Sequence, residues 1–201
     1  MLESNLVGKK KKYSTAKNGI DIDGWNGTVT TSPGVTQVFV EGKLTFNFSP
    51  SAVNWVRIPY AGTPYPRGED CDIAVKFNIR NIPSGYVIVW SKFRQGDNVA
   101  SIMPVVRANG NVIVYFGGAT YPTASFVTFN AEHELKTTRR GSVYTTYLDG
   151  VQILQFTAVG NDQAAYDWTF GSYFDPYGNI ITTTYANPAD WTLLGISIKR
   201  A

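Results

Sequence analysis

The stretch TTRRGSVYTTYLDGVQI, residues 137–153, gives the clearest indication of how this chain folds. Polar and bulky residues alternate toward the pair Asp149-Gly150, and apolar residues return directly after it. Asp-Gly adopts positive φ angles at low cost, which suits a two-residue turn whose twist matches the flanking strands. The stretch is therefore predicted to form a β-hairpin in which Asp149 is a turn residue.

Strand signals continue along most of the chain. Residues 72–79 alternate strictly, which predicts a strand with an apolar face and a wet face. Its apolar face comprises Ile73, Val75, Phe77 and Ile79, and its wet face includes Lys76 and Asn78. Further strands are predicted within residues 37–48, 85–93, 100–108, 111–118, 125–129, 143–148, 151–156 and 191–199. No window keeps the spacing of a helix, so many short strands with frequent turn signals, such as Asn109-Gly110, predict an all-β sandwich or barrel.

Length and composition favour one domain without disulfides. The chain has 201 residues and a single cysteine, Cys71, which we expect to be a buried thiol in a protein that folds in a reducing compartment. No apolar run reaches the length of a membrane-spanning helix. Polar residues follow the basic N-terminal residues, so we expect no secretory signal and no membrane insertion.

The positive charge is concentrated at the N-terminus. Residues 1–17 hold five lysines and one glutamate, whereas the remaining residues hold 13 basic and 14 acidic side chains. We therefore expect residues 1–24 to form an extended basic arm and residues 25–201 to form the sandwich. The expected contact residues of the arm are Lys9, Lys10, Lys11 and Lys12. Contact with nucleic acid is expected only through this arm, because the body has no basic surface.

The order of the motifs resembles that of concanavalin A-like, laminin-G-like domains. The resemblance rests on residues 44–60, 68–81, 85–98, 132–153 and 190–200, the fourth of which resembles the strand and "lYvDG" hairpin of that family. It implies a jelly-roll β-sandwich of two antiparallel sheets. It also implies that His133 packs against its neighbours. Some of these domains bind calcium at the rim of the sandwich, for which the candidate ligands here are Asp97, Asp149, Asp162 and Asp167.

Two kinds of enzyme share this fold, and neither pattern is complete here. Glycoside hydrolases place two carboxylates on one strand, but the cluster of Glu69, Asp70 and Asp72 precedes a strand that then becomes apolar. Residues 172–179 resemble the tyrosine-bearing strand of polysaccharide lyases, but Asp175-Pro176 interrupts it. We therefore expect no catalytic residue, no metal site beyond the calcium candidates, and no other cofactor.

Aromatic residues in the turn-rich stretch 160–188 are the positive signal for binding. Not all of them fit into a core, and exposed aromatics contact sugars or protein partners. The predicted contact residues, for a neighbouring subunit or a glycan, are Trp168, Tyr173, Phe174 and Tyr177.

These observations predict a non-enzymatic binding or structural module. The favoured hypothesis is a bacteriophage virion protein, either a capsid decoration protein or a fibre or tail-associated module. It would fold in the host cytoplasm, assemble with copies of itself or other virion proteins, and be anchored through its arm. The alternative is a lectin-like adhesin module that binds a cell-surface glycan. A cytoplasmic protein is the alternative location, and a polysaccharide-degrading enzyme is the third functional class.

Overall fold

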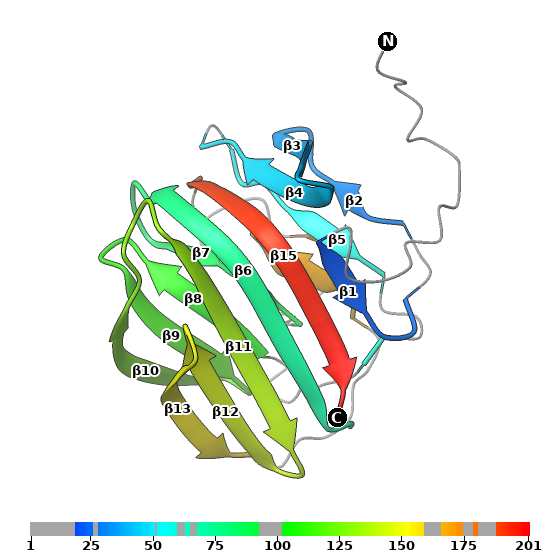
Figure 1. Ribbon diagram of the computed structural model, residues 1–201. Helices are drawn as coiled ribbons and strands as arrows, with labels where there is room; N and C mark the ends of the chain where they lie inside the picture. The colour runs from blue at the N-terminus through cyan, green and yellow to red at the C-terminus, as the bar shows by residue number, and fades with distance from the viewer. Residues whose placement is uncertain are drawn as a thin grey trace.

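The computed structural model describes residues 19–25, 28–50, 52–59, 63–64, 68–92, 102–158, 166–174, 179–180 and 188–201. All regular structure in these residues is β-strand, which confirms the predicted all-β class (Figure 1). The strands are β1 (Ile20–Ile22), β2 (Thr30–Thr31), β3 (Val35–Val40), β4 (Lys43–Phe48), β5 (Val56–Ile58), β6 (Cys71–Asn81), β7 (Tyr86–Ile88), β8 (Ile102–Arg107), β9 (Asn111–Phe116), β10 (Ala119–Phe126), β11 (Glu132–Arg140), β12 (Val143–Leu148), β13 (Val151–Thr157), β14 (Trp168–Phe170) and β15 (Asp190–Arg200). The described part contains no helix long and apolar enough to cross a membrane.

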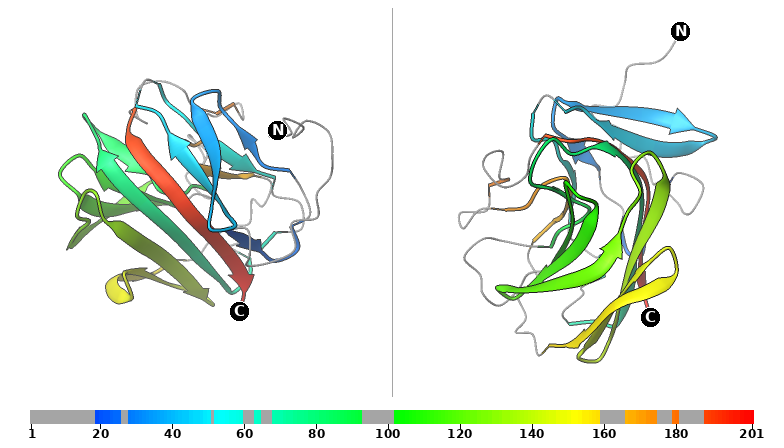
Figure 2. Two further views of the ribbon diagram at one scale, coloured as in Figure 1. Left: turned by 45° about the horizontal axis from the view of Figure 1, so that its top comes forward. Right: turned by 90° about the vertical axis from the view of Figure 1, so that its left-hand side faces the viewer.

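The strands form a sandwich of two layers. One layer is a sheet in the order β13-β12-β11-β6-β15-β4-β3, with β1 added in parallel beside β15; we call it the large sheet. The other layer combines the sheets β10-β9-β8-β7 and β14-β5-β2. Reciprocal backbone hydrogen bonds between Ser91 and Thr169, of 2.7 and 3.0 Å, join these two sheets. Figure 2 shows the large sheet covering this opposite layer, as the predicted antiparallel β-sandwich requires.

The inner face of β6 is the centre of the core. Its alternating residues Ile73, Val75, Phe77 and Ile79 are each at most 1% exposed, as the alternation predicts. Lys76 is exposed, but Asn78 is only half-exposed. Asn78 lies between Glu132 of β11 and Thr192 of β15, so neighbouring strands cover a side chain that was expected to face water.

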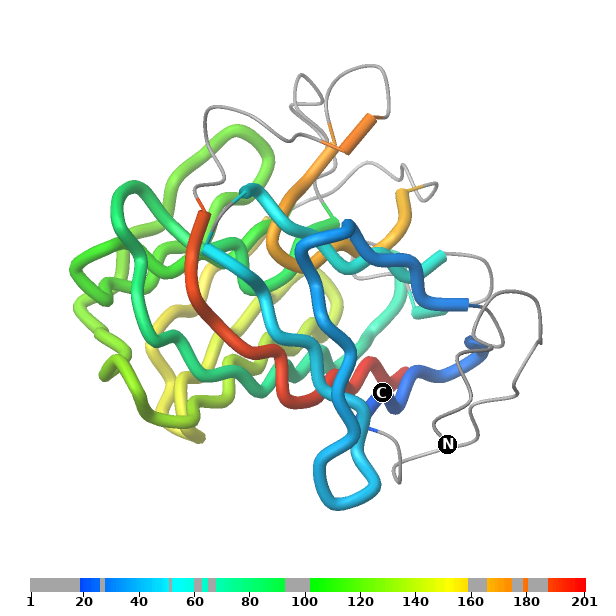
Figure 3. The backbone as a smooth tube through the Cα atoms, turned by 90° about the horizontal axis from the view of Figure 1, so that it is seen from above, coloured from blue at the N-terminus to red at the C-terminus, as the bar shows by residue number. Residues whose placement is uncertain are grey.

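Tight turns determine how the strands pair. Asp149 and Gly150 have φ angles of 51° and 82°, and Leu148 pairs directly with Val151, which confirms the predicted two-residue hairpin. The Asn109-Gly110 turn between β8 and β9 is confirmed as well. A third turn, at Glu41-Gly42, divides the predicted segment 37–48 into β3 and β4. The resulting hairpin extends beyond the body of the sandwich (Figure 3).

Three boundaries differ from the sequence-based prediction. The strand signal at 125–129 misses most of β10, where Pro122 interrupts the pattern, and β11 was recognised only through the family resemblance. The sandwich also begins before residue 25: Ile20 and Ile22 are 2% and 8% exposed and pair with β15. Lys199 holds this segment through ion pairs with Asp21 and Asp23.

The predicted arm contacts Lys9, Lys10, Lys11 and Lys12 lie outside the described residues.

Replacement of Phe77 by alanine should strongly destabilise the sandwich. The change would leave a cavity beside the fully buried centre of β6, at a cost of about 3–5 kcal/mol in the free energy of unfolding. Urea unfolding would measure it. Lys76→Ala is the matched control on the same strand, and a loss as large as that of Phe77→Ala would contradict the assignment of the two faces.

Candidate functional site

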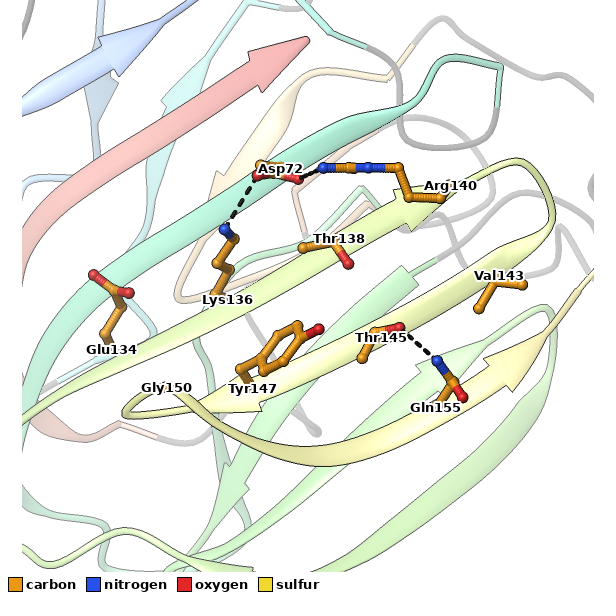
Figure 4. A pocket seen from close by; sticks show the side chains of 10 residues that line it. All are labelled: Asp72, Glu134, Lys136, Thr138, Arg140, Val143, Thr145, Tyr147, Gly150 and Gln155. Carbon is orange, nitrogen blue, oxygen red and sulfur yellow. Dashed lines mark hydrogen bonds and ion pairs between the residues drawn. The ribbon is translucent and has the colours of Figure 1, made fainter. Parts of the chain in front are cut away.

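The outer face of the large sheet carries a hollow lined mainly by polar side chains. Since Ile73 and Val75 point into the core, Asp72 and the outward residues of the strands beside β6 point away from it. They surround a hollow of about 710 Å³, which we call the outer trough (Figure 4). Its polar lining comes from four strands and comprises Asp72 of β6, Glu134, Lys136, Thr138 and Arg140 of β11, Thr145 and Tyr147 of β12, and Gln155 of β13.

The charges of the outer trough largely neutralise one another. Asp72 lies 3.1 Å from Lys136 Nζ and 2.7 Å from a terminal nitrogen of Arg140. Asp72 therefore forms ion pairs with both cations. Partial burial opposes ionisation of Asp72, but the interactions with Arg140 and Lys136 outweigh it and hold the pKa of this carboxyl below its usual value. Asp72 therefore stays ionised and orients both cations.

The remaining lining suits a ligand rich in hydroxyl groups. Gln155 Nε2 donates a hydrogen bond of 3.1 Å to Thr145 Oγ1, which orients the amide across β12 and β13. Tyr147 lies opposite Lys136 in the strand register and offers a half-exposed ring. Amide and hydroxyl groups hydrogen-bond to hydroxyls, and an aromatic ring packs on apolar C–H surface. Because all these residues belong to paired strands, their positions are set before a ligand arrives.

The Asp149-Gly150 turn is anchored at the end of the outer trough. Asp149 Oδ1 accepts a 2.8 Å hydrogen bond from the Glu134 N–H, and the Asp149 N–H donates to the Glu134 carbonyl at 2.9 Å. Asp149 Oδ2 lies 2.7 Å from His133 Nδ1, while His133 Nε2 contacts the backbone of Thr128. The imidazole also lies 6.0 Å from the Phe77 ring, between ring centres. His133 thus has the packing role that the sequence suggested, and it ties the hairpin to β11.

The predicted aromatic contact residues lie mostly inside the molecule. Trp168 is 0% exposed, and Tyr173 and Phe174 are each 4% exposed. The Trp168 indole N–H donates to Thr63 Oγ1 at 3.0 Å, and Lys92 Nζ lies 4.9 Å from the centre of its ring. These three aromatics are therefore packed within the single chain rather than exposed as expected. The turn-rich composition of residues 160–188 gave no sign that β14 is a strand of the opposite layer. Tyr177 lies outside the described residues.

The carboxylates considered from the sequence have other partners. Glu69 pairs with Arg200 at 2.9 Å, and Asp70 accepts the Gly141 N–H at 2.7 Å. Of the calcium candidates, Asp149 anchors the hairpin and Asp167 pairs with Arg57 at 2.6 Å. Asp97 and Asp162 lie outside the described residues. Within the described ranges, no three His, Cys, Asp or Glu residues gather as metal ligands.

Apart from Asp72, which was considered only as a hydrolase carboxylate, the residues of the outer trough were not identified from the sequence. Their signal is the outward half of the alternation within each strand: Glu134, Lys136, Thr138 and Arg140 recur at every second position, and so do Val143, Thr145 and Tyr147. On a single strand, such residues are typical of an ordinary solvent-exposed face and do not indicate a binding site. Only the pairing of β6, β11, β12 and β13 brings them together as one surface.

Loss of the His133 imidazole should loosen the hairpin without unfolding the sandwich. His133→Ala removes the contacts with Asp149 and Thr128, and we expect a loss of about 1–3 kcal/mol in the free energy of unfolding. Chemical denaturation would measure it. Glu132→Ala, on the same strand, is the exposed control, and equal losses in both variants would contradict the anchoring role.

The Cys71 thiol should be unreactive in the folded protein. Cys71 is buried, as expected, and burial raises the pKa of its thiol to about 12. A thiol-specific disulfide reagent at pH 8 should therefore modify native protein at least about 100-fold more slowly than urea-unfolded protein. Because the unfolded thiol ionises near pH 9.0 and the folded thiol only near 12, the free energy of unfolding should fall as the pH rises between these values. Equal rates in both states would refute the burial of the thiol.

Comparison with known proteins relates the chain to others by fold alone. No protein-family model and no curated protein sequence matches it. Among solved structures, a mutant Trypanosoma rangeli sialidase displaying trans-sialidase activity superposes with a TM-score of 0.63 at 12% identity, over 86% of this chain and 27% of the sialidase. The binding domain of Paraclostridial Mosquitocidal Protein 1 also superposes with a TM-score of 0.63 at 12% identity. The match covers 87% of this chain and 44% of that protein's chain.

A similar structure of comparable size is the carbohydrate-binding module CBM66 from Bacillus subtilis. Its TM-score is 0.52 at 12% identity, and the match covers 90% of this chain and 99% of the module. By contrast, the chain spans only about a quarter of the sialidase and less than half of the mosquitocidal protein's chain. These likenesses confirm the β-sandwich, whereas the expected link to bacteriophage modules stays a prediction.

Proposed function

We propose that this chain is a non-enzymatic carbohydrate-binding module that holds a glycan in the outer trough. The observation that carries the proposal is the hollow of about 710 Å³ on the large sheet, lined by hydrogen-bonding side chains and the Tyr147 ring. Polar groups on rigid strands supply orientation, and an aromatic ring supplies apolar contact. Glycans present both hydroxyl groups and C–H faces, so they match both parts of this lining.

The charge arrangement supports binding rather than catalysis. A glycosidase acid needs a carboxyl group whose pKa is raised. The pKa of Asp72 is instead lowered, and the second carboxylate of the trough, Glu134, lies 3.7 Å from Lys76 Nζ. Asp72, held as an ion-paired anion, orients cations and water but is not prepared to donate a proton.

The likeness to CBM66 supports the same function, because the two folds match over nearly the whole of that module. The mosquitocidal protein's structure is likewise that of a binding domain. The lectin-like alternative of the sequence analysis thus becomes the main hypothesis. A virion role and assembly with copies of itself stay predictions from the sequence.

Affinity electrophoresis in gels that contain xylan, glucomannan, laminarin, dextran, pectin or hyaluronan would test the proposal. At least one polysaccharide should retard the protein. Tyr147→Ala and Gln155→Ala should each weaken this retention about tenfold, equal to about 1.4 kcal/mol of binding free energy. Both side chains lie on the outer face, so the fold should persist.

The matched control is Tyr115→Ala, which removes a half-exposed tyrosine from β9 in the opposite layer. Its retention should equal that of the unmodified chain. Unchanged retention in Tyr147→Ala and Gln155→Ala, together with lost retention in Tyr115→Ala, would move the site to the other layer. Absence of retention by every polysaccharide would refute the carbohydrate-binding function.

A further inference from the structure

We propose that the outer trough continues into a second hollow on the large sheet, and that the two together bind a linear, uncharged polysaccharide that runs across the strands. This inference rests on the proposed function and adds the class of ligand. It concerns internal segments of a chain rather than a single terminal sugar.

The second hollow lies beside the first on the same face. It has a volume of about 210 Å³ and is lined by β1, β4, β6 and β15 residues that include Asp21, Lys43, Ala74, Lys76, Gly195 and Ser197. Glu134 lines both hollows. Ala74, which lines the second, lies opposite Lys136, which lines the first. The two hollows are therefore neighbours in the strand register.

One ion pair stands between the hollows. Lys76 Nζ lies 3.7 Å from Glu134, and the two side chains are 62% and 37% exposed. Exposed pairs of this length contribute little to stability, so a ligand can displace the two side chains at small cost. Both remain available afterwards as hydrogen-bonding groups for the displacing chain.

The combined surface is long enough for several sugar units. Five strand spacings separate β13 from β4, which corresponds to about 24 Å across the sheet. The right-hand view of Figure 2 shows the β3–β4 and β12–β13 hairpins projecting on the outer side of the large sheet, at its opposite ends.

The floor of the second hollow is low and largely apolar. Ala74 carries only a methyl group and lies opposite Ser197. A Cβ atom built on Gly195 would meet only ordinary contacts, at 3.5 Å from the Gly19 carbonyl oxygen and 3.9 Å from Lys76 Cβ. The position above Gly195 is therefore bordered by the Gly19 carbonyl and the Lys76 side chain but overlapped by neither. The apolar face of a sugar ring can lie on this floor while Lys43 and Asp21 reach its hydroxyl groups from the sides.

The charges favour an uncharged chain. The two hollows contain three carboxylates and four cationic side chains. Each carboxylate already has a cation: Asp21 pairs with Lys199, Asp72 with Lys136 and Arg140, and Glu134 with Lys76. An acidic polysaccharide would have to compete with the cations of Asp21 and Asp72, whereas an uncharged one leaves these two carboxylates paired and displaces only the exposed Lys76–Glu134 pair.

Calorimetric titration with oligosaccharides of increasing length tests the inference. The probes are the disaccharide to octasaccharide series made from the neutral polysaccharide that retains the protein most strongly. Affinity should rise about tenfold or more from the shortest to the longest, which is the gain from one or two further net hydrogen bonds. The affinity of the longest should change little between low and high salt.

Filling the second hollow should remove only this gain. In Ala74→Gln/Ser197→Gln, the octasaccharide should bind about as weakly as the disaccharide, whose affinity should not change. Ala124→Gln, at an exposed position of β10, is the matched control. If thermal unfolding shows that the double variant is unfolded, Lys43→Ala replaces it. This variant removes a lining side chain of the second hollow and should likewise weaken binding of the octasaccharide but not of the disaccharide.

Two results would overturn the inference while leaving the proposed function intact. One is equal affinity for the disaccharide and the octasaccharide, which would confine binding to the outer trough. The other is stronger, salt-sensitive binding of pectin or hyaluronan fragments, which would refute an uncharged ligand. Absence of binding to every probe would instead refute the carbohydrate-binding function itself.

Discussion

The burial of one face of β6 is the constraint on which this structure depends. Its inward residues, such as Val75 and Phe77, are fully buried between the layers, which leaves one register for β11 and β15 beside it. A shift of one residue would turn the apolar face outward. The same register brings Asp72 next to Lys136 and Arg140 on the other face. The core and the outer trough are therefore two consequences of one pairing.

This origin explains why the candidate site is already ordered. Its side chains extend from paired strands, of which β6, β11 and β12 are held by backbone hydrogen bonds on both sides. The Asp149 turn is tied to Glu134 and His133. The ion pairs and the Gln155–Thr145 hydrogen bond further restrict the lining. A ligand therefore loses little affinity to the ordering of protein side chains. Binding side chains placed on flexible loops would instead have to become ordered when the ligand binds.

Sequence patterns predicted the elements whose signal is local. Neighbouring residues determine the alternation in β6 and the Asp-Gly and Asn-Gly turns, and all three are confirmed. The predictions that failed concern features that depend on contacts between segments far apart in the sequence. The short β1 gains its place only by pairing with β15, more than a hundred residues away, and Trp168 becomes core only because β14 joins the opposite layer. The outer trough was missed for the same reason, since its lining comes from four strands.

A site on a sheet face also limits how selectivity arises. The backbones of β6, β11 and β12 already use their hydrogen bonds within the sheet, so on these strands only side chains can distinguish one ligand of the proposed class from another. Asp72 constrains this choice, because a ligand that drew Arg140 away would leave a partly buried carboxylate with less compensation, at a cost in free energy. Binding that preserves this ion pair is therefore favoured. Selectivity then falls to groups such as Tyr147 and Gln155, which do not have to give up a charge partner.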